Sequence, residues 1–206
     1  MDCKKYWEVY DRATEALSDA QSGFDDADAN LDIATENFAV ASLGGYSLLG
    51  GASAGTAAYV GSSALAGTVI AASSVVTAGA VGIALLAAFA IALDSAKRSF
   101  EMSKVAHGKA LKKLNDVIKV AEDALDAVCA CEAFNRDPKN AQPPPDSEEI
   151  DKNIEQEEEE IIGIHASNDE AESSNDEVTE LLEEIEDLVD EAEQGEQSDD
   201  NLMAVA

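Results

Sequence analysis

The chain has 206 residues and a formal net charge of −30. So acidic a chain repels phosphate backbones, which excludes nucleic acid as an expected partner. Residues 1–145 hold 18 acids and 12 bases (12 − 18 = −6), and residues 146–206 hold 25 acids and one base (1 − 25 = −24). The sequence therefore predicts a main region over 1–135, a proline-rich linker over 136–146 and an acidic tail over 147–206.

The N-terminal region places apolar and small residues alternately three and four positions apart, which is the heptad spacing of a packed helix. The line predicts a helix of about 35 residues. Its members are Cys3, Tyr6, Tyr10, Ala13, Leu17, Ala20, Phe24, Ala27, Leu31, Ala34 and Phe38.

A second line of the same spacing runs backward from Cys131 to Leu93 and predicts a second helix of similar length, which ends before Pro138. Its members are Cys131, Val128, Ala124, Ala121, Val117, Leu114, Ala110, His107, Ser103, Phe100, Ala96 and Leu93. Leu111, Ile118 and Leu125 widen the apolar stripe.

The two lines predict an antiparallel pair in which the numbers of facing residues sum to about 133. This register places Asp19 opposite Lys113, and Arg12 opposite Glu122. Cys3 falls opposite Cys129 or Cys131, and a disulfide to either one would join the ends of the pair.

The segment between the helices, from Asn37 to Leu93, contains 57 residues without a charge. The register places a hairpin turn at Ala66 and Gly67, because glycine adopts positive φ at little cost. The arms over 39–64 and 69–93 are each about 38 Å long as helices, which is enough to cross a hydrocarbon core of roughly 30 Å. The sequence therefore predicts a membrane-inserting helical hairpin.

Small residues favour close packing of the two arms and association between copies, because hydrophobicity gives no such drive in lipid. The predicted packing residues are Gly44, Ser47, Gly51 and Gly55 on the first arm, and Gly79 and Gly82 on the second. A homo-oligomer in a lipid bilayer is the expected assembly. A soluble alanine- and glycine-rich hairpin in an oligomer stays open as an alternative.

The acidic tail contains an amphipathic segment over 175–193, preceded by a candidate capping box at Ser174 and Glu177. This helix is expected to cover the arms before insertion or to bind a delivery, chaperone or immunity protein. A disordered tail is an equal alternative. The apolar face consists of Val178, Leu181, Leu182, Ile185, Leu188 and Val189.

Catalytic motifs are not found in the sequence. It has two histidines, and it contains no phosphate-binding loop, nucleophile elbow or histidine-based metal motif. Three thiolates lack a clear fourth ligand for zinc. We therefore expect no enzymatic activity, no cofactor and no metal site.

The layout of "AVASLGGYSLLGG", "AGTVIAASSVVTAGAVGIALLAAFAIAL" and their flanking helices resembles the hydrophobic hairpin of colicin-type pore formers. It also resembles small pore-forming effectors of bacterial type VI secretion, which carry no signal peptide. The resemblance implies an all-α, glycine-zipper toxin, secreted in soluble form and membrane-bound after insertion, which depolarises a target membrane. The alternative is a resident two-span scaffold, anchor or immunity protein with a coiled-coil stalk.

Overall fold

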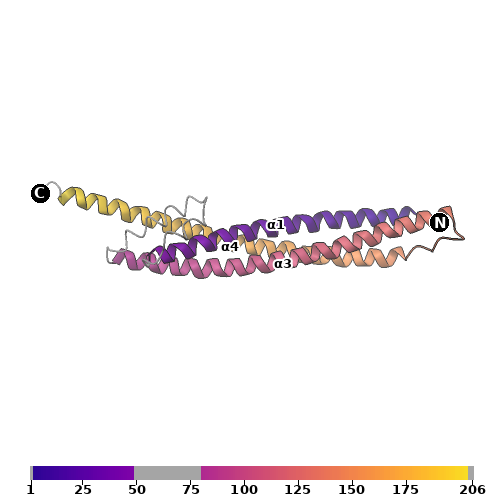
Figure 1. Cartoon of the computed structure of the whole chain (residues 1–206), viewed down its shortest axis with the longest axis horizontal. Helices are drawn as coiled ribbons and strands as arrows, with labels where there is room; N and C mark the ends of the chain where they lie inside the picture. The colour runs from indigo at the N-terminus through magenta and orange to yellow at the C-terminus, as the bar shows by residue number, and fades with distance from the viewer. Residues whose placement is uncertain (1, 49–79, 204–206) are drawn as a thin grey trace. The chain divides into compact units, whose positions relative to one another are not determined.

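The computed structural model describes residues 2–48 and 80–203, and side chains within 2–43 and 87–189. The described residues form three α-helices and no strand, which confirms the all-α class (Figure 1). They are α1 (Lys4–Leu48), α3 (Ala80–Arg136) and α4 (Ser147–Met203). The chain divides into two compact units, which we describe separately. Unit 1 takes Met1–Ala29 and Lys104–Glu170, and unit 2 takes Asn30–Ser103 and Ala171–Ala206.

Aspartates cap two of the helices. The Asp2 side chain accepts a hydrogen bond from the backbone N–H of Lys4 (3.0 Å), and Asp146 accepts one from Glu148 (3.0 Å). Each bond satisfies an amide that has no partner within the first turn. Ser174 lies inside α4, so its predicted role as the N-cap of a helix over 175–193 is wrong.

In unit 1, α1 presents two neighbouring columns of residues to two different helices. Phe24 lies against His107 of α3, with ring centroids 5.3 Å apart. Gly23, the adjacent residue, lies against α4, where a Cβ would come within 3.3 Å of Ile164. Phe24 belongs to the column predicted from Cys3 to Phe38, whereas the column through Gly23 was not predicted.

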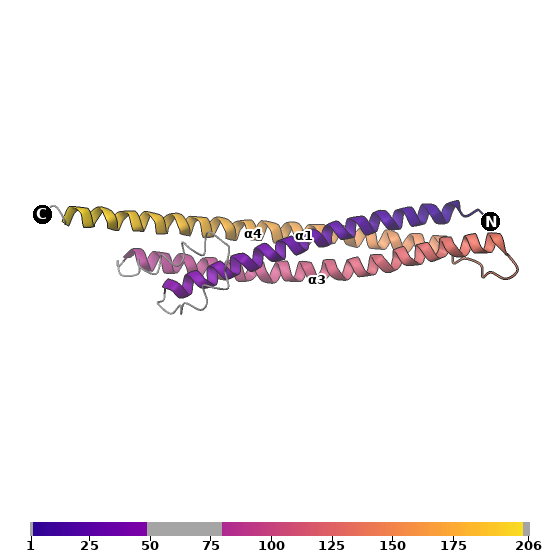
Figure 2. The ribbon, with the colours of Figure 1, turned by 45° about the horizontal axis from the view of Figure 1, so that its top comes forward.

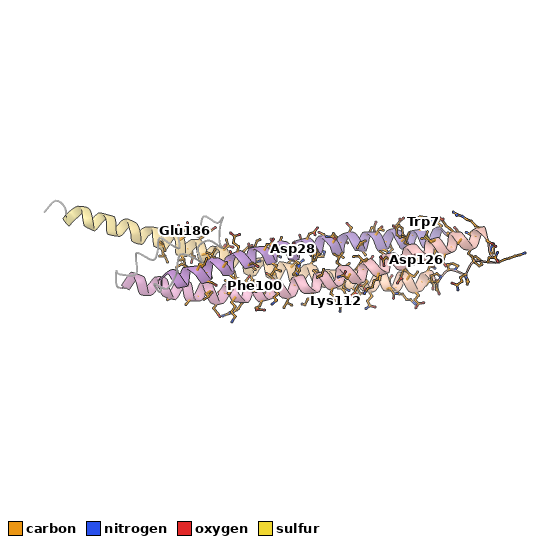
Figure 3. All side chains as sticks on the ribbon, in the orientation of Figure 1. Trp7, Asp28, Phe100, Lys112, Asp126 and Glu186 are labelled. Atoms are coloured by element: carbon orange, nitrogen blue, oxygen red, sulfur yellow. A yellow bond between two sulfur atoms is a disulfide. The ribbon has the colours of Figure 1, made fainter. Side chains whose placement is uncertain are left out.

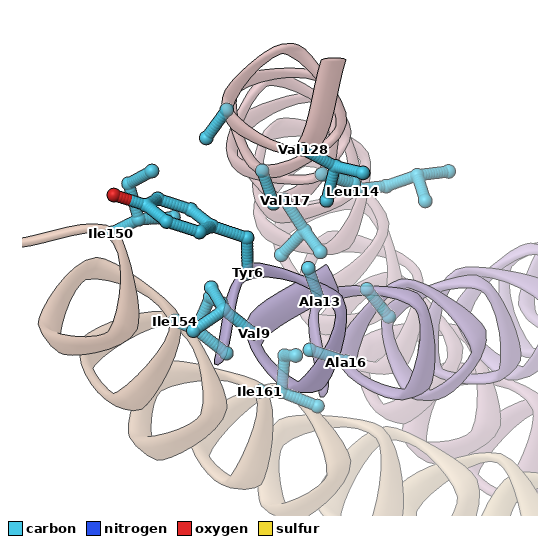
Figure 4. Close-up of a cluster of buried hydrophobic side chains, with 14 of the residues drawn as sticks. Tyr6, Val9, Ala13, Ala16, Leu114, Val117, Val128, Ile150, Ile154 and Ile161 are labelled. Atoms are coloured by element: carbon cyan, nitrogen blue, oxygen red, sulfur yellow. The ribbon is translucent and has the colours of Figure 1, made fainter. Parts of the chain in front are cut away.

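The core of unit 1 joins all three helices around small side chains (Figure 4). Ile154 of α4 lies beside Val9, and Ile161 beside Ala16. The buried residues are Tyr6, Val9, Ala13, Ala16, Ala20, Leu114, Val117, Ala121, Ala124, Ala127, Val128, Cys131, Ile150, Ile154 and Ile161. Alanine at so many core positions allows the helix axes to approach closely. Because Ile150, Ile154 and Ile161 are buried among residues of α1 and α3, α4 belongs to this core as well.

Contacts in unit 1 give the directions of the helices, whose ribbons are seen in Figure 2. In unit 1, Cys3 of α1 forms a disulfide with Cys131 of α3, with Cα atoms 5.9 Å apart, so the beginning of α1 meets the end of α3. By contrast, α4 runs parallel to α1. The Asn168 amide donates to the Gly23 carbonyl (2.7 Å), at an offset of 145 residues. Cys129 is exposed and has a free thiol.

Two cations of unit 1 bind α4 rather than the partners expected from the sequence. Arg12 contacts Asp151 (2.7 Å) and Glu158 (2.9 Å), and Lys113 contacts Glu157 (2.7 Å) and Glu160. The predicted pairs Arg12–Glu122 and Asp19–Lys113 are therefore wrong. The physical reason is that Lys113 projects from the face of α3 that packs on α4.

Burial by itself lowers the pKa of Lys113, but hydrogen bonds from its ammonium to Glu157 and Glu160 outweigh burial, and the pKa is raised. The hydrogen bond from Lys113 lowers the pKa of Glu160. Both shifts keep the pair ionised, so this contact between α3 and α4 is retained at neutral pH.

Within the described residues, the acidic tail forms one helix, Ser147–Met203, which includes the predicted helix over 175–193. Its buried positions recur every three and four residues, with Glu157 half-buried at one of them. The others are Ser147, Ile150, Ile154, Ile161, Ile164, Asn168, Ala171, Asn175, Val178, Leu182, Ile185 and Val189. Several positions of this repeat are polar, so the spacing of apolar residues alone does not indicate it.

Gly23→Ala and Gly108→Ala form a matched test of the close contact with α4. A Cβ at Gly108 would have no neighbour within 4 Å, so alanine should stabilise unit 1 by about 0.5–1 kcal/mol through helix propensity. At Gly23 the Cβ would press on Ile164, and we expect this gain to be lost. Urea unfolding of both variants checks the difference, and equal stabilisation would contradict the close approach.

Cys3→Ser should lower the free energy of unfolding by about 2–4 kcal/mol, because the Cys3–Cys131 disulfide restricts the unfolded chain across 128 residues. Cys129→Ser is the control and should change stability by less than about 0.5 kcal/mol. Urea denaturation without reductant measures both. The assignment fails if Cys129→Ser is the more damaging change.

Candidate functional site at the ends of the uncharged segment

In unit 2, the described ends of the uncharged segment lie side by side beneath α4. Val40 and Ala41 near the end of α1 share one buried cluster with Phe89 and Ala92 near the start of α3. Phe38 stacks on Phe100 nearby, with ring centroids 5.7 Å apart. Side chains near the end of α1 therefore pack against side chains near the start of α3 in this unit.

The predicted apolar face of the tail covers this place. Val178, Leu182, Ile185 and Val189 are buried in the same cluster, and Leu181 is half-buried against it. Leu188 was assigned to the same face, but its side chain is 47% exposed. All six residues lie on α4 as one helix, and five of them contact the cluster.

The outer face of α4 over the same turns is acidic. Glu183, Glu184 and Asp187 are exposed, while Glu186, which is labelled on α4 in Figure 3, is partly covered. Since the inner face packs on apolar side chains, α4 replaces an apolar surface with an anionic one at this end of unit 2. Carboxylates are strongly hydrated, so the outer face of α4 favours contact with water rather than with lipid.

A buried polar layer lies next to the apolar cluster and fastens α4 to both neighbours. The side-chain amide of Asn175 donates to the backbone carbonyl of Asn30 (2.9 Å), and its side-chain oxygen Oδ1 accepts from the Ser99 hydroxyl. The side-chain amide of Asn37 donates to the backbone carbonyl of Asn175 (3.3 Å) and to the Thr179 hydroxyl (3.1 Å). Such bonds each contribute about 0.5–1.5 kcal/mol net, because water replaces them when the helices separate.

These layer residues were not predicted from the sequence. Asn30 and Asn37 lie one heptad apart on α1, and Asn175 lies one heptad after Asn168 on α4. Asparagines repeated at this spacing within heptads are a usable signal, because a polar residue at a core position fixes the register of packed helices.

The other predicted packing residues are only partly described. Gly44 and Ser47 belong to α1, and Gly82 belongs to α3, but their surroundings are not described. The remaining predicted packing and turn residues lie outside the described residues. They are Gly51, Gly55, Ala66, Gly67 and Gly79.

Within the described residues, none of the helices has an apolar stretch long enough to cross a membrane. No group of three or more histidine, cysteine or carboxylate side chains is placed to hold a metal ion in that part of the chain.

Comparisons with known proteins give no relative. No protein-family model matches the chain, and no curated protein or solved structure matches it.

Leu182→Ala and Leu188→Ala compare a buried and an exposed leucine that lie six residues apart on α4. Leu182 is 3% exposed, so truncation should cost about 2–5 kcal/mol and loosen α4 in unit 2. Leu188, at 47% exposed, should cost well under about 1 kcal/mol. Hydrogen exchange of residues 171–189 measures the loosening, and equal exchange in the two variants would contradict the cover.

Proposed function

We propose that this protein inserts its uncharged segment, residues 37–93, into a lipid bilayer and forms a pore there. The observation that supports this proposal best is the pairing of the two ends of that segment in one buried cluster, Val40 and Ala41 beside Phe89 and Ala92. A segment that begins and ends at one place is suited to enter a membrane as a hairpin, with both flanking helices kept on the same side.

The composition of the segment supports insertion. It has 57 residues without a charge, and each charge at a bilayer centre would cost about 2.5–3.5 kcal/mol on insertion scales. Its second part, over 69–93, carries eleven large apolar residues, which supply about −5 kcal/mol on the same scale. Its first part is richer in glycine and serine, so we propose that the first part enters together with the second.

In this proposal α4 keeps the protein soluble before it meets a membrane. Its apolar face covers the ends of the segment, while its outer face is anionic. An anionic helix is repelled by anionic lipid headgroups, so α4 has to leave the cluster before the segment enters lipid. The glycine-rich faces of the arms then associate between copies into a homo-oligomer, which depolarises the target membrane.

Ala87→Asp tests the membrane role of the segment. Ala87 is exposed on α3, so aspartate should preserve the soluble fold, while it places a carboxylate inside the segment that has to enter lipid. We expect at least tenfold less current across a planar bilayer at equal protein concentration. Ala133→Asp is the control, because it adds the same charge to another exposed alanine of α3.

The result distinguishes the candidate functions. Equal currents from wild type and Ala87→Asp would contradict insertion of the segment. If neither the wild type nor the two variants conduct, but the protein remains stably bound to vesicles, the resident scaffold or anchor is favoured. A protein that neither conducts nor binds vesicles would favour a soluble helical oligomer.

A further inference from the structure

A groove of about 830 Å³ runs along unit 1 between α1 and α3. Its apolar floor is formed by Leu17 of α1 together with Leu114 and Ile118 of α3. Its α1 wall is polar and includes Asp25 and Asp26. The groove therefore combines an apolar floor with an acidic edge.

The apolar surface continues along α3 beyond the groove. Leu111 and Leu125 lie one heptad before and after Ile118, and all three are exposed. Leu111 and Leu125 are 14 positions apart, which is about 21 Å of helix. Exposed leucine and isoleucine repeated at heptad spacing place three large apolar side chains on one side of α3, which is typical of a helix-binding face.

This face is separate from the surface that α4 occupies. The side of α1 that meets α4 carries Gly23, and the side of α3 that meets α4 carries Lys113. The groove is lined by other residues of the same two helices, including Leu17 of α1 and Leu114 of α3, and by none of α4. The groove therefore offers room for a fourth helix in unit 1, and α4 does not fill it.

Charge decides between the candidate occupants. Asp25 accepts a hydrogen bond from Gln21 (2.8 Å), and the ion pairs found among the described residues include neither Asp25 nor Asp26. Before insertion, the net charge of −30 disfavours a second copy or an anionic lipid surface as the occupant of this acidic groove. A basic helix is attracted to the same edge.

We propose that this groove is the docking site for an amphipathic helix of another protein, with an apolar stripe flanked by lysine or arginine. The partner's apolar side chains lie on Leu114 and Ile118, and its cations face Asp25 and Asp26. The proposal concerns the soluble protein and does not depend on the membrane role of the uncharged segment.

The test measures binding of two 21-residue peptides to the oxidised full-length protein by calorimetry. Both peptides carry leucine at heptad core positions, and their flanking positions are lysine in one and glutamate in the other. We expect the lysine peptide to bind at least tenfold more tightly than the glutamate peptide, and to weaken with added salt.

Ile118→Asp locates the binding. Ile118 is 37% exposed in the groove, whereas Ile162, at 70% exposed, lies on α4 outside it. We expect Ile118→Asp to weaken the lysine peptide at least tenfold and Ile162→Asp to leave its affinity unchanged. Circular dichroism and urea unfolding of both variants confirm that each retains the fold.

Three results would overturn the proposal. Equal binding of the two peptides would remove the charge argument, and equal loss in both variants would place the peptide elsewhere. A concentration-dependent dimer in sedimentation that Ile118→Asp dissolves would make a second copy the occupant. If Ile118→Asp unfolds the chain, Leu111→Asp on the same stripe and Asp25→Lys on the edge replace it, with the same expected losses.

Discussion

The close approach of α4 to both other helices is the constraint on which the rest of the structure depends. At Gly23 a single added carbon would press on Ile164, and the Asn168 amide reaches the Gly23 carbonyl at 2.7 Å. Such contacts require small or hydrogen-bonding side chains on the facing columns, because a large side chain would hold the helices apart. The small and polar residues in these heptads are therefore the condition under which three helices share one core.

This constraint explains which parts of the fold were predictable. The all-α class and the columns of α1 and α3 that face each other follow from large apolar residues such as Phe24 and Phe38 at regular spacing. The columns that face α4 hold residues such as Gly23 and Ser99, which apolar periodicity does not register. The fold was therefore predicted as two helices with a tail, and the cation Lys113 was assigned to the wrong neighbour.

The candidate site was predictable in part for the same reason. The apolar residues of α4 from Val178 to Val189 were identified from the sequence, because they stand out against the acidic background. The polar layer around Asn175 was missed, since an asparagine in an acidic segment is ordinarily read as solvated. Its role in packing is evident only from the structure, where its side chain forms hydrogen bonds with the carbonyl of Asn30 and the hydroxyl of Ser99.

The mixture of apolar and polar contacts bears on how α4 would leave the uncharged segment. An entirely apolar interface would bind more tightly, because buried apolar area contributes roughly 25 cal/mol per Å². Each hydrogen bond contributes only about 0.5–1.5 kcal/mol net, because water replaces it when the helices separate. Asn175 and its partners therefore fix the register of α4 without adding much to its affinity. A cover that is specific in position but moderate in strength is what conditional insertion requires, because it must hold in water and still separate at a membrane.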